Sequence, residues 1–256
     1  MKKLNMIFCI ILILLSAIFF SGCEEKKSMD STTAQNIMTN MMNSLKEINS
    51  YSYVIDGSII INDVNMGITD GYVEFDLGNK KMKMDQNITM SMFGNANTQT
   101  YIINNIEYTN KTEQSSYVEL TKKNITENIW DNYDSYGNQD EINEISEIKR
   151  LEDETIDNID CYVIEIIPDM DKYFQVMNNL NETYSGYTLN GIEIKYWVEK
   201  VGYLPIKIYT KLDMYTSSRI YGDMIYIYET ENLYSNYNSQ FLIELPQWAS
   251  EANWIY

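Results

Sequence analysis

Apolar and polar side chains alternate over several long stretches of this chain, and this alternation most constrains its fold. Residues 81–84 alternate between Lys and Met, and residues 88–92 repeat the pattern with Ile, Met, Thr and Ser. A period of two places alternate residues on opposite faces of a β-strand. Similar stretches, joined by short Gly and Asn turns, fill much of residues 51–120 and 191–245. Consecutive strands with short connections predict an antiparallel sheet.

Helical periodicity occurs in fewer places. Residues 31–48 predict a first helix that begins at Ser31, Thr32 or Thr33. Its apolar side chains recur at helical spacing and form one stripe: Ile37, Met38, Met41, Met42, Leu45 and Ile48. Residues 124–142 predict a short helix up to residue 133 followed by a polar loop, and residues 170–184 predict another helix. Residues 145–154 fit either a helix or a strand. About ten strands with two or three helices predict an α+β fold.

The N-terminus has the features of an export signal. Two lysines precede an apolar run over residues 7–20, and Ser-Gly-Cys follows at residues 21–23. The run is too short for the ~20 residues that span a bilayer, and it resembles a lipoprotein signal peptide. We therefore expect residues 1–22 to be removed and Cys23 to be lipidated. Residues 23–30 would be a lipidated tether and residues 31–256 a single domain, anchored on the outer face of the cytoplasmic membrane.

Charge and residue usage exclude several classes of function. Loss of the two signal-peptide lysines takes the net charge from −18 to −20, which argues against binding to nucleic acid or to anionic lipid surfaces. The chain has no histidine, which excludes Ser-His-Asp and Cys-His catalysis and His-ligated metal sites. The composition does not exclude a glycosidase mechanism that uses two carboxylates, although no pair of acids in the sequence stands out as catalytic. Cys161 would be the one cysteine left without a lipid, so we expect no disulfide in the domain.

Two polar patterns have simple interpretations. An acidic cluster lacks the spacing of a calcium loop and predicts a solvated face; its members are Asp140, Glu141, Glu144, Glu147, Glu152, Asp153 and Glu154. Four sequons would matter only in a host that glycosylates surface proteins; their asparagines are Asn87, Asn110, Asn124 and Asn181.

One late segment resembles a known family. Residues 194–207 contain an acid-Lys-x-Gly-x-x-Pro-x-Lys pattern from Glu199 to Lys207, which resembles a hairpin of LolA-like and LppX/LprG-like lipoproteins. Residues 158–168 and 241–246 resemble the middle and final strands of that family. The resemblance implies an unclosed half-barrel, a strongly curved antiparallel sheet with helices covering its concave face. It also implies an apolar cavity for the acyl chains of lipids or lipoproteins, with no cofactor and no catalysis.

The methionines offer a lining for such a cavity, because their flexible side chains adapt to variable apolar ligands. The candidate lining residues are Met38, Met41, Met42, Phe75, Met82, Met84, Met90, Met92, Tyr196, Ile208 and Ile225. The alternative is that these residues form an ordinary core beneath the first helix.

The sequence thus predicts a membrane-tethered, monomeric lipoprotein that binds or carries lipids or acylated lipoproteins without catalysis. The alternative is a surface structural or interaction module that binds an envelope polymer or another protein. A cavity between the first helix and the sheet would favour lipid binding, whereas a fully packed core would favour the alternative.

Overall fold

The computed structural model describes residues 32–91, 94–113, 117–125, 130, 146–172, 188–218 and 222–255. The described residues from Thr33 onward belong to one compact unit. The fold given below is that of residues 33–256. The expected signal peptide and Cys23 lie outside the described residues.

Helix α2 (Ala34–Leu45) confirms the predicted first helix, with slightly shorter bounds. Thr33 is its N-cap, and the Thr33 side chain accepts a hydrogen bond from the backbone N–H of Asn36 at 3.2 Å. Five apolar residues of the predicted stripe are buried: Ile37, Met38, Met41, Met42 and Leu45. Within the described ranges, no helix is both long and apolar enough to span a bilayer.

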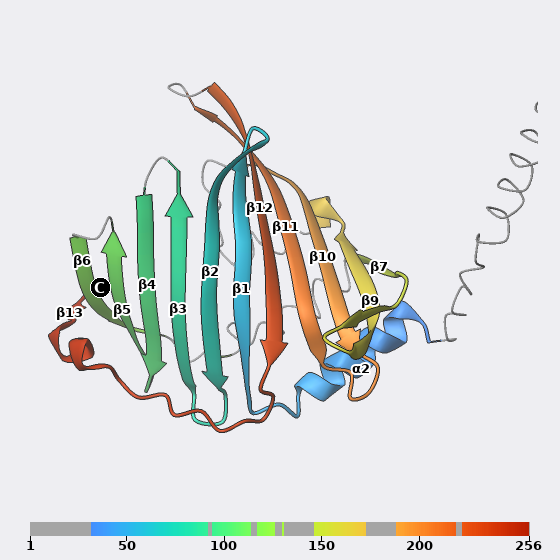
Figure 1. Ribbon diagram of the computed structural model, residues 1–256, viewed down its shortest axis with the longest axis horizontal. Helices are drawn as coiled ribbons and strands as arrows, with labels where there is room; N and C mark the ends of the chain where they lie inside the picture. The colour runs from blue at the N-terminus through green and yellow to red at the C-terminus, as the bar shows by residue number, and fades with distance from the viewer. Residues whose placement is uncertain are drawn as a thin grey trace, which may run out of the picture. The chain divides into compact units, whose positions relative to one another are not determined.

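The described strands form one sheet of thirteen strands (Figure 1). They are β1 (Ser50–Ile61), β2 (Val64–Asp76), β3 (Lys81–Met90), β4 (Gly94–Ile103), β5 (Ile106–Glu113), β6 (Tyr117–Asn124), β7 (Ser146–Arg150), β8 (Glu154–Ile156), β9 (Ile159–Pro168), β10 (Thr188–Glu199), β11 (Pro205–Ser218), β12 (Gly222–Ser235) and β13 (Asn253–Trp254). A short 3-10 helix, η1 (Gln247–Glu251), precedes β13. The expectation of about ten strands was too low, because the sheet also contains the short strands β7, β8 and β13.

Two antiparallel meanders build the sheet. Each strand from β1 to β6 pairs with the next, as does each strand from β9 to β12. Strand β12 then returns to β1 and pairs with it through ten residue pairs, from Ser52↔Ser235 to Ile61↔Tyr226. Among the strands of the described residues, only β13 is parallel to its partner, β6. The order ends at β13 on one side and β7 on the other, so the sheet is unclosed, as expected.

Tight turns confirm the predicted connections between neighbouring strands. Asn104 and Asn105 join β4 to β5 with φ of 54° and 60°, the left-handed backbone that two-residue hairpin turns require. Asn62 and Asp63 make the same kind of turn between β1 and β2. Asparagine and aspartate tolerate this conformation better than most residues.

The two faces of the sheet differ in chemistry. We call the face that packs against α2 the helix-side face, and the opposite one the far face. Buried residues of α2 share one core cluster with Tyr51, Phe75 and Tyr196, so these three residues define the helix-side face. The far face carries charged pairs such as Lys83–Asp85, at 3.2 Å. Alternation along the strands separates the two sets, with interruptions at irregularities such as the one between Leu189 and Gly191 of β10.

The C-terminal segment covers part of the far face. Ile243 packs against Tyr101 and Ile103 of β4 in a second buried cluster. The Lys81 ammonium donates a hydrogen bond to the Ile243 carbonyl at 3.2 Å. In Figure 1 this segment follows the lower ends of the strands to β13.

Helix α2 lies near the lower ends of β9 and β10 (Figure 1), and its core cluster extends across the sheet to β4. The helices expected within residues 124–142 and 170–184 fall mostly outside the described residues. Residues 145–154, which fitted either a helix or a strand, contain β7 and the start of β8.

Candidate functional site on the helix-side face

A packed core fills the helix-side face beneath α2. The rings of Tyr51 and Phe75 stack with centroids 4.9 Å apart, and those of Tyr53 and Tyr234 lie 5.0 Å apart. Burial raises the pKa of the Tyr234 hydroxyl well above its ordinary value. Ile37 and Met41 of α2 are fully buried in the same cluster. This end of the face therefore has the packing of a protein interior, which is the arrangement expected for the alternative, a structural or interaction module, and any lipid would have to bind elsewhere on the face.

An ionic cluster closes the edge of this core. The Arg150 guanidinium donates to both Asp153 oxygens, at 2.8 and 3.1 Å, and the Lys200 ammonium lies 2.6 Å from Asp153. Both cations stack on the ring of Tyr162, at 4.9 and 5.2 Å from its centroid. The side chain of Arg150 is only 5% exposed, so its charge needs this pairing. The cluster fixes the β7–β9 edge beside α2.

Beyond α2, the helix-side face carries apolar side chains that are only half-buried, with the polar side chains of Thr69, Gln86 and Thr230 among them. The apolar residues concerned are Ile59, Ile61, Met84, Ile88, Met90, Leu212, Met214, Tyr226 and Tyr228. Register places them on one face: Met84 lies opposite Val73, Leu212 opposite Tyr228, and Met214 opposite Tyr226. Apolar side chains that gather on one face without being fully packed are a common sign of a ligand or partner site. We take this half-buried apolar surface as the candidate site and call it the apolar surface.

The predicted lining residues divide into three groups. Seven of them lie in the packed core, where they are at most 8% exposed: Met38, Met41, Met42, Phe75, Met82, Tyr196 and Ile208. Met84 and Met90 lie on the apolar surface. Met92 lies outside the described residues.

Ile225 does not share a face with the other candidate lining residues. It pairs with Tyr215 and is 47% exposed, and it lies on the far face because its neighbour Tyr226 points to the helix side. The structure therefore does not bring Ile225 together with the other residues. The sequence did not single out Ile59, Ile88, Leu212 or Met214, which belong to the apolar surface through pairings between distant strands.

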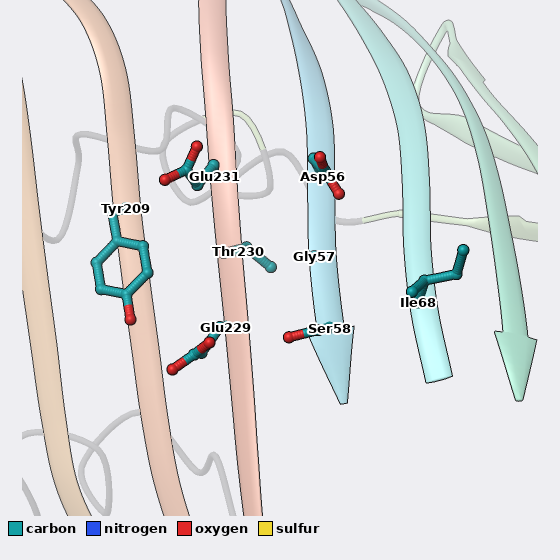
Figure 2. A pocket seen from close by; sticks show the side chains of 8 residues that line it. All are labelled: Asp56, Gly57, Ser58, Ile68, Tyr209, Glu229, Thr230 and Glu231. Atoms are coloured by element: carbon teal, nitrogen blue, oxygen red, sulfur yellow. The ribbon is translucent and has the colours of Figure 1, made fainter. Parts of the chain in front are cut away.

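The far face carries a shallow hollow that the sequence did not predict (Figure 2). It has a volume of about 300 Å³ over β2, β1, β12 and β11, and its lining includes Asp56, Tyr209, Glu229 and Glu231. Burial first, and then the Glu229 and Glu193 carboxylates, raise the pKa of Tyr209 to about 12. Lys211 pairs with Glu229 at 3.2 Å, and Lys207 pairs with Glu231 at 3.4 Å. Cross-strand ion pairs of this kind are typical of a solvated face.

Neither a second hollow of about 260 Å³ nor a third of about 500 Å³ lies beneath α2. The second lies on the far face around Trp197 and Tyr209. The third lies between Tyr108 of β5 and the segment around Pro246. The contact between α2 and the sheet is thus distinct from all three hollows.

Chemical reactivity is low in the described part of the chain. No three acidic or cysteine side chains approach closely enough there to hold a metal ion. Cys161 is fully buried, and burial together with the Glu199 carboxylate raises the pKa of its thiol to about 11. A buried thiol with a raised pKa is a poor nucleophile.

The sequon asparagines are also placed by the sheet. Asn87 is exposed on the far face and donates to Asp70 at 2.9 Å. Asn110 lies within β5 and donates to Gln99 at 3.4 Å, and Asn124 ends β6. Asn181 lies outside the described residues, as do Asp140, Glu141 and Glu144 of the acidic cluster.

Comparison with solved structures identifies the fold. The chain aligns with the lipoprotein LppX of Mycobacterium tuberculosis at a TM-score of 0.50 and 10% sequence identity, covering 82% of this chain and 98% of LppX. The fold is therefore LolA/LppX-like.

Two other solved structures align less closely. A LolA superfamily protein from Nitrosomonas europaea has a TM-score of 0.26 at 14% identity, covering 83% of this chain and 96% of its own. A domain from Vibrio parahaemolyticus, described as an outer membrane lipoprotein-sorting protein, has a TM-score of 0.27 at 12% identity, covering 83% and 94%. No family model matches the chain, and no curated protein matches it in sequence.

Proposed function

We propose that this protein binds lipids or acylated lipoproteins on the apolar surface and does no covalent chemistry. The observation that carries the proposal is the group of apolar side chains on the helix-side face beyond the packed core, which are half-buried rather than sealed. The LolA/LppX-like fold supports an exported role, since LppX is itself a lipoprotein.

The driving force for such binding is the removal of alkyl chains from water. Each buried CH₂ contributes roughly 0.8 kcal/mol, so ten methylenes give a large gain in free energy. Met84, Met90 and Met214 suit this role, because flexible thioether side chains repack around chains of different shape. Of the residues predicted to line the cavity, we keep Met84 and Met90 as ligand contacts and assign the seven buried residues to the core.

The proposal includes the N-terminal anchor. Cys23 would carry the lipid after residues 1–22 are removed, residues 24–30 would form the tether, and residues 31–256 would be the lipid-binding domain. A tether of this length would keep the apolar surface close to the outer face of the cytoplasmic membrane. Stable anchoring needs more than one acyl chain, which a diacylglyceryl cysteine supplies.

The test uses the full chain purified from membranes. Solvent extraction followed by mass spectrometry should find copurifying lipid, and the N-terminal peptide should carry diacylglycerol on Cys23. Met214→Gln should lower the uptake of a fluorescent fatty acid several-fold, because it places an amide on the apolar surface.

Ile225→Gln is the matched control, since Ile225 lies on the far face near the same β11–β12 hairpin tip. Its uptake should equal that of the unmodified protein. The absence of both copurifying lipid and fatty-acid uptake would refute lipid binding.

A further inference from the structure

The hollow of about 500 Å³ beside the C-terminal segment differs in charge from the other two hollows. Its lining consists of Tyr108, Lys122, Leu245, Pro246, Gln247, Ala249 and Ser250. Lys122 is the one charged side chain among these described lining residues, whereas each of the other two hollows is lined by at least two carboxylates. Glu244 and Glu251 lie nearby in sequence but do not line the hollow. In a chain with 37 acidic side chains against 19 basic ones, this hollow therefore favours an anion.

Pairing between strands places Lys122 at the centre of this site. Lys122 of β6 lies opposite Tyr108 of β5 on one side and opposite Trp254 of β13 on the other. These strands lie at one end of the sheet (Figure 1). The Lys122 ammonium lies 5.3 Å from the centroid of the Trp254 ring, within the range of a cation–π contact. The Ser250 hydroxyl already donates to the Gln247 carbonyl at 2.9 Å, so Lys122 is the main donor to an anion.

Large apolar side chains beside the hollow are exposed. Leu245 is 44% exposed and Trp254 is 45% exposed. Leu242 and Ile255 of the same C-terminal segment are also exposed. Tryptophan, aliphatic side chains and lysine together are typical of surfaces that lie in the membrane–water interface. Interfaces between proteins, by contrast, are depleted in lysine.

We propose that this patch, consisting of the hollow with Lys122, Leu245 and Trp254, docks on the surface of a phospholipid bilayer. Trp254 and Leu245 enter the interfacial region, and the Lys122 ammonium binds a lipid phosphate in the hollow. Because the whole chain is acidic, docking depends on these local contacts and not on net charge. The inference goes beyond the proposed ligand binding on the helix-side face and uses only the proposed tether.

The experiment anchors the full chain in vesicles of phosphatidylcholine whose acyl chains carry bromine near the head groups, and it measures the quenching of tryptophan fluorescence. Trp254→Phe should remove most of the quenching, because bromine quenches only the tryptophans that lie close to it. Trp197→Phe is the matched control. It should keep the quenching, since Trp197 lies in β10 near the other end of the sheet.

Two further substitutions test the contacts around Trp254. Lys122→Gln and Leu245→Ser should each lower the quenching several-fold. Leu233→Ser is the control for Leu245→Ser, because Leu233 is 41% exposed on the far face of β12. Lys149→Gln is the control for Lys122→Gln, because Lys149 is exposed in β7 at the other end of the sheet. Both controls should keep the full quenching, and a thermal melt followed by circular dichroism would verify that each variant is folded.

The outcomes separate this inference from the proposed function. If the protein floats with the vesicles but Trp254→Phe leaves the quenching unchanged, the tether stands and the docking is wrong. Equal effects of Leu245→Ser and Leu233→Ser would also overturn the docking. If inorganic phosphate removes the quenching at an ionic strength at which chloride does not, the hollow is a site for free phosphate instead. A chain that does not float would overturn the tether and the docking together, whereas fatty-acid uptake tests ligand binding separately.

Discussion

Gly57 lies where three strands leave no room for a side chain. A Cβ at this position would come within 2.7 Å of the Glu229 carbonyl oxygen of β12 and of the Thr69 methyl group of β2. The carbonyl belongs to the backbone and cannot turn aside. Gly57 thus lets β2 and β12 approach β1 closely on the helix-side face. This close approach lies at the β1–β12 pairing that joins the two meanders, which we call the seam.

We expect Gly57→Ala to lower the free energy of unfolding by about 1–3 kcal/mol, as overpacking in a filled site usually does. Gly191→Ala is the control, because nothing lies within 4 Å of a Cβ built there. That substitution should change stability by less than about 1 kcal/mol. Urea unfolding midpoints would measure both effects, and equal midpoints for the two variants would contradict this account of Gly57.

At the scale of elements, α2 acts as part of the core. Its apolar stripe is sealed against the sheet, and the Ser44 hydroxyl donates to the Gly202 carbonyl at 2.7 Å, which links the helix to the β10–β11 hairpin. The Thr33 N-cap, the apolar stripe and the Ser44–Gly202 hydrogen bond together fix the position of the helix. The half-buried apolar surface begins where this packing ends.

Met41→Ala should destabilise the protein by about 2–5 kcal/mol, because it opens a cavity in a filled core. Asn43→Ala, on the exposed side of the same helix, should change stability by less than about 1 kcal/mol. Thermal melts and fatty-acid uptake should be measured together. A small loss of stability with a large loss of uptake would instead assign Met41 to the ligand site.

At the scale of the whole molecule, the β1–β12 seam holds the two meanders together. Strands β1, β2, β11 and β12 have hydrogen-bonded neighbours on both sides, whereas β7 ends the sheet. At the other end, β13 covers β6 only at Thr121 and Lys122. Strands at the ends of a sheet have fewer partners and open more readily.

Amide hydrogen exchange should therefore be slowest in β1 and β12 and fastest in β6 and β7, read by mass spectrometry of peptides. Exchange in β7 as slow as that in β1 would show that another part of the protein covers this edge. Bound lipid should further slow exchange in the strands of the apolar surface, and this change should be absent from the C-terminal segment.

Several features could be predicted from local sequence alone. Alternation in residues 81–84 predicts a strand with Met on one face, and the Asn104–Asn105 pair predicts a tight turn. Both follow from backbone geometry that each segment satisfies by itself. The same holds for α2, whose stripe and N-cap lie within 13 residues.

Ile225 shows where this reasoning fails. Its segment alternates Ile with Tyr, so both faces of the strand are apolar enough to face inward. A shift of one residue in pairing exchanges the two faces, and the pairing with β1 and β11 chooses Tyr226 for the helix side.

The sequence by itself determined most of the strands, the first helix and several turns, because hydrophobic period and turn residues act within short segments. The final strand expected over residues 240–245 was wrong, since that segment is not in a strand. Only the tertiary structure decided that β12 joins β1, that the methionines of α2 are sealed in the core, and that Ile225 lies on the far face. These features depend on hydrogen bonds and packing between residues that are distant in sequence, and no local pattern specifies such pairings.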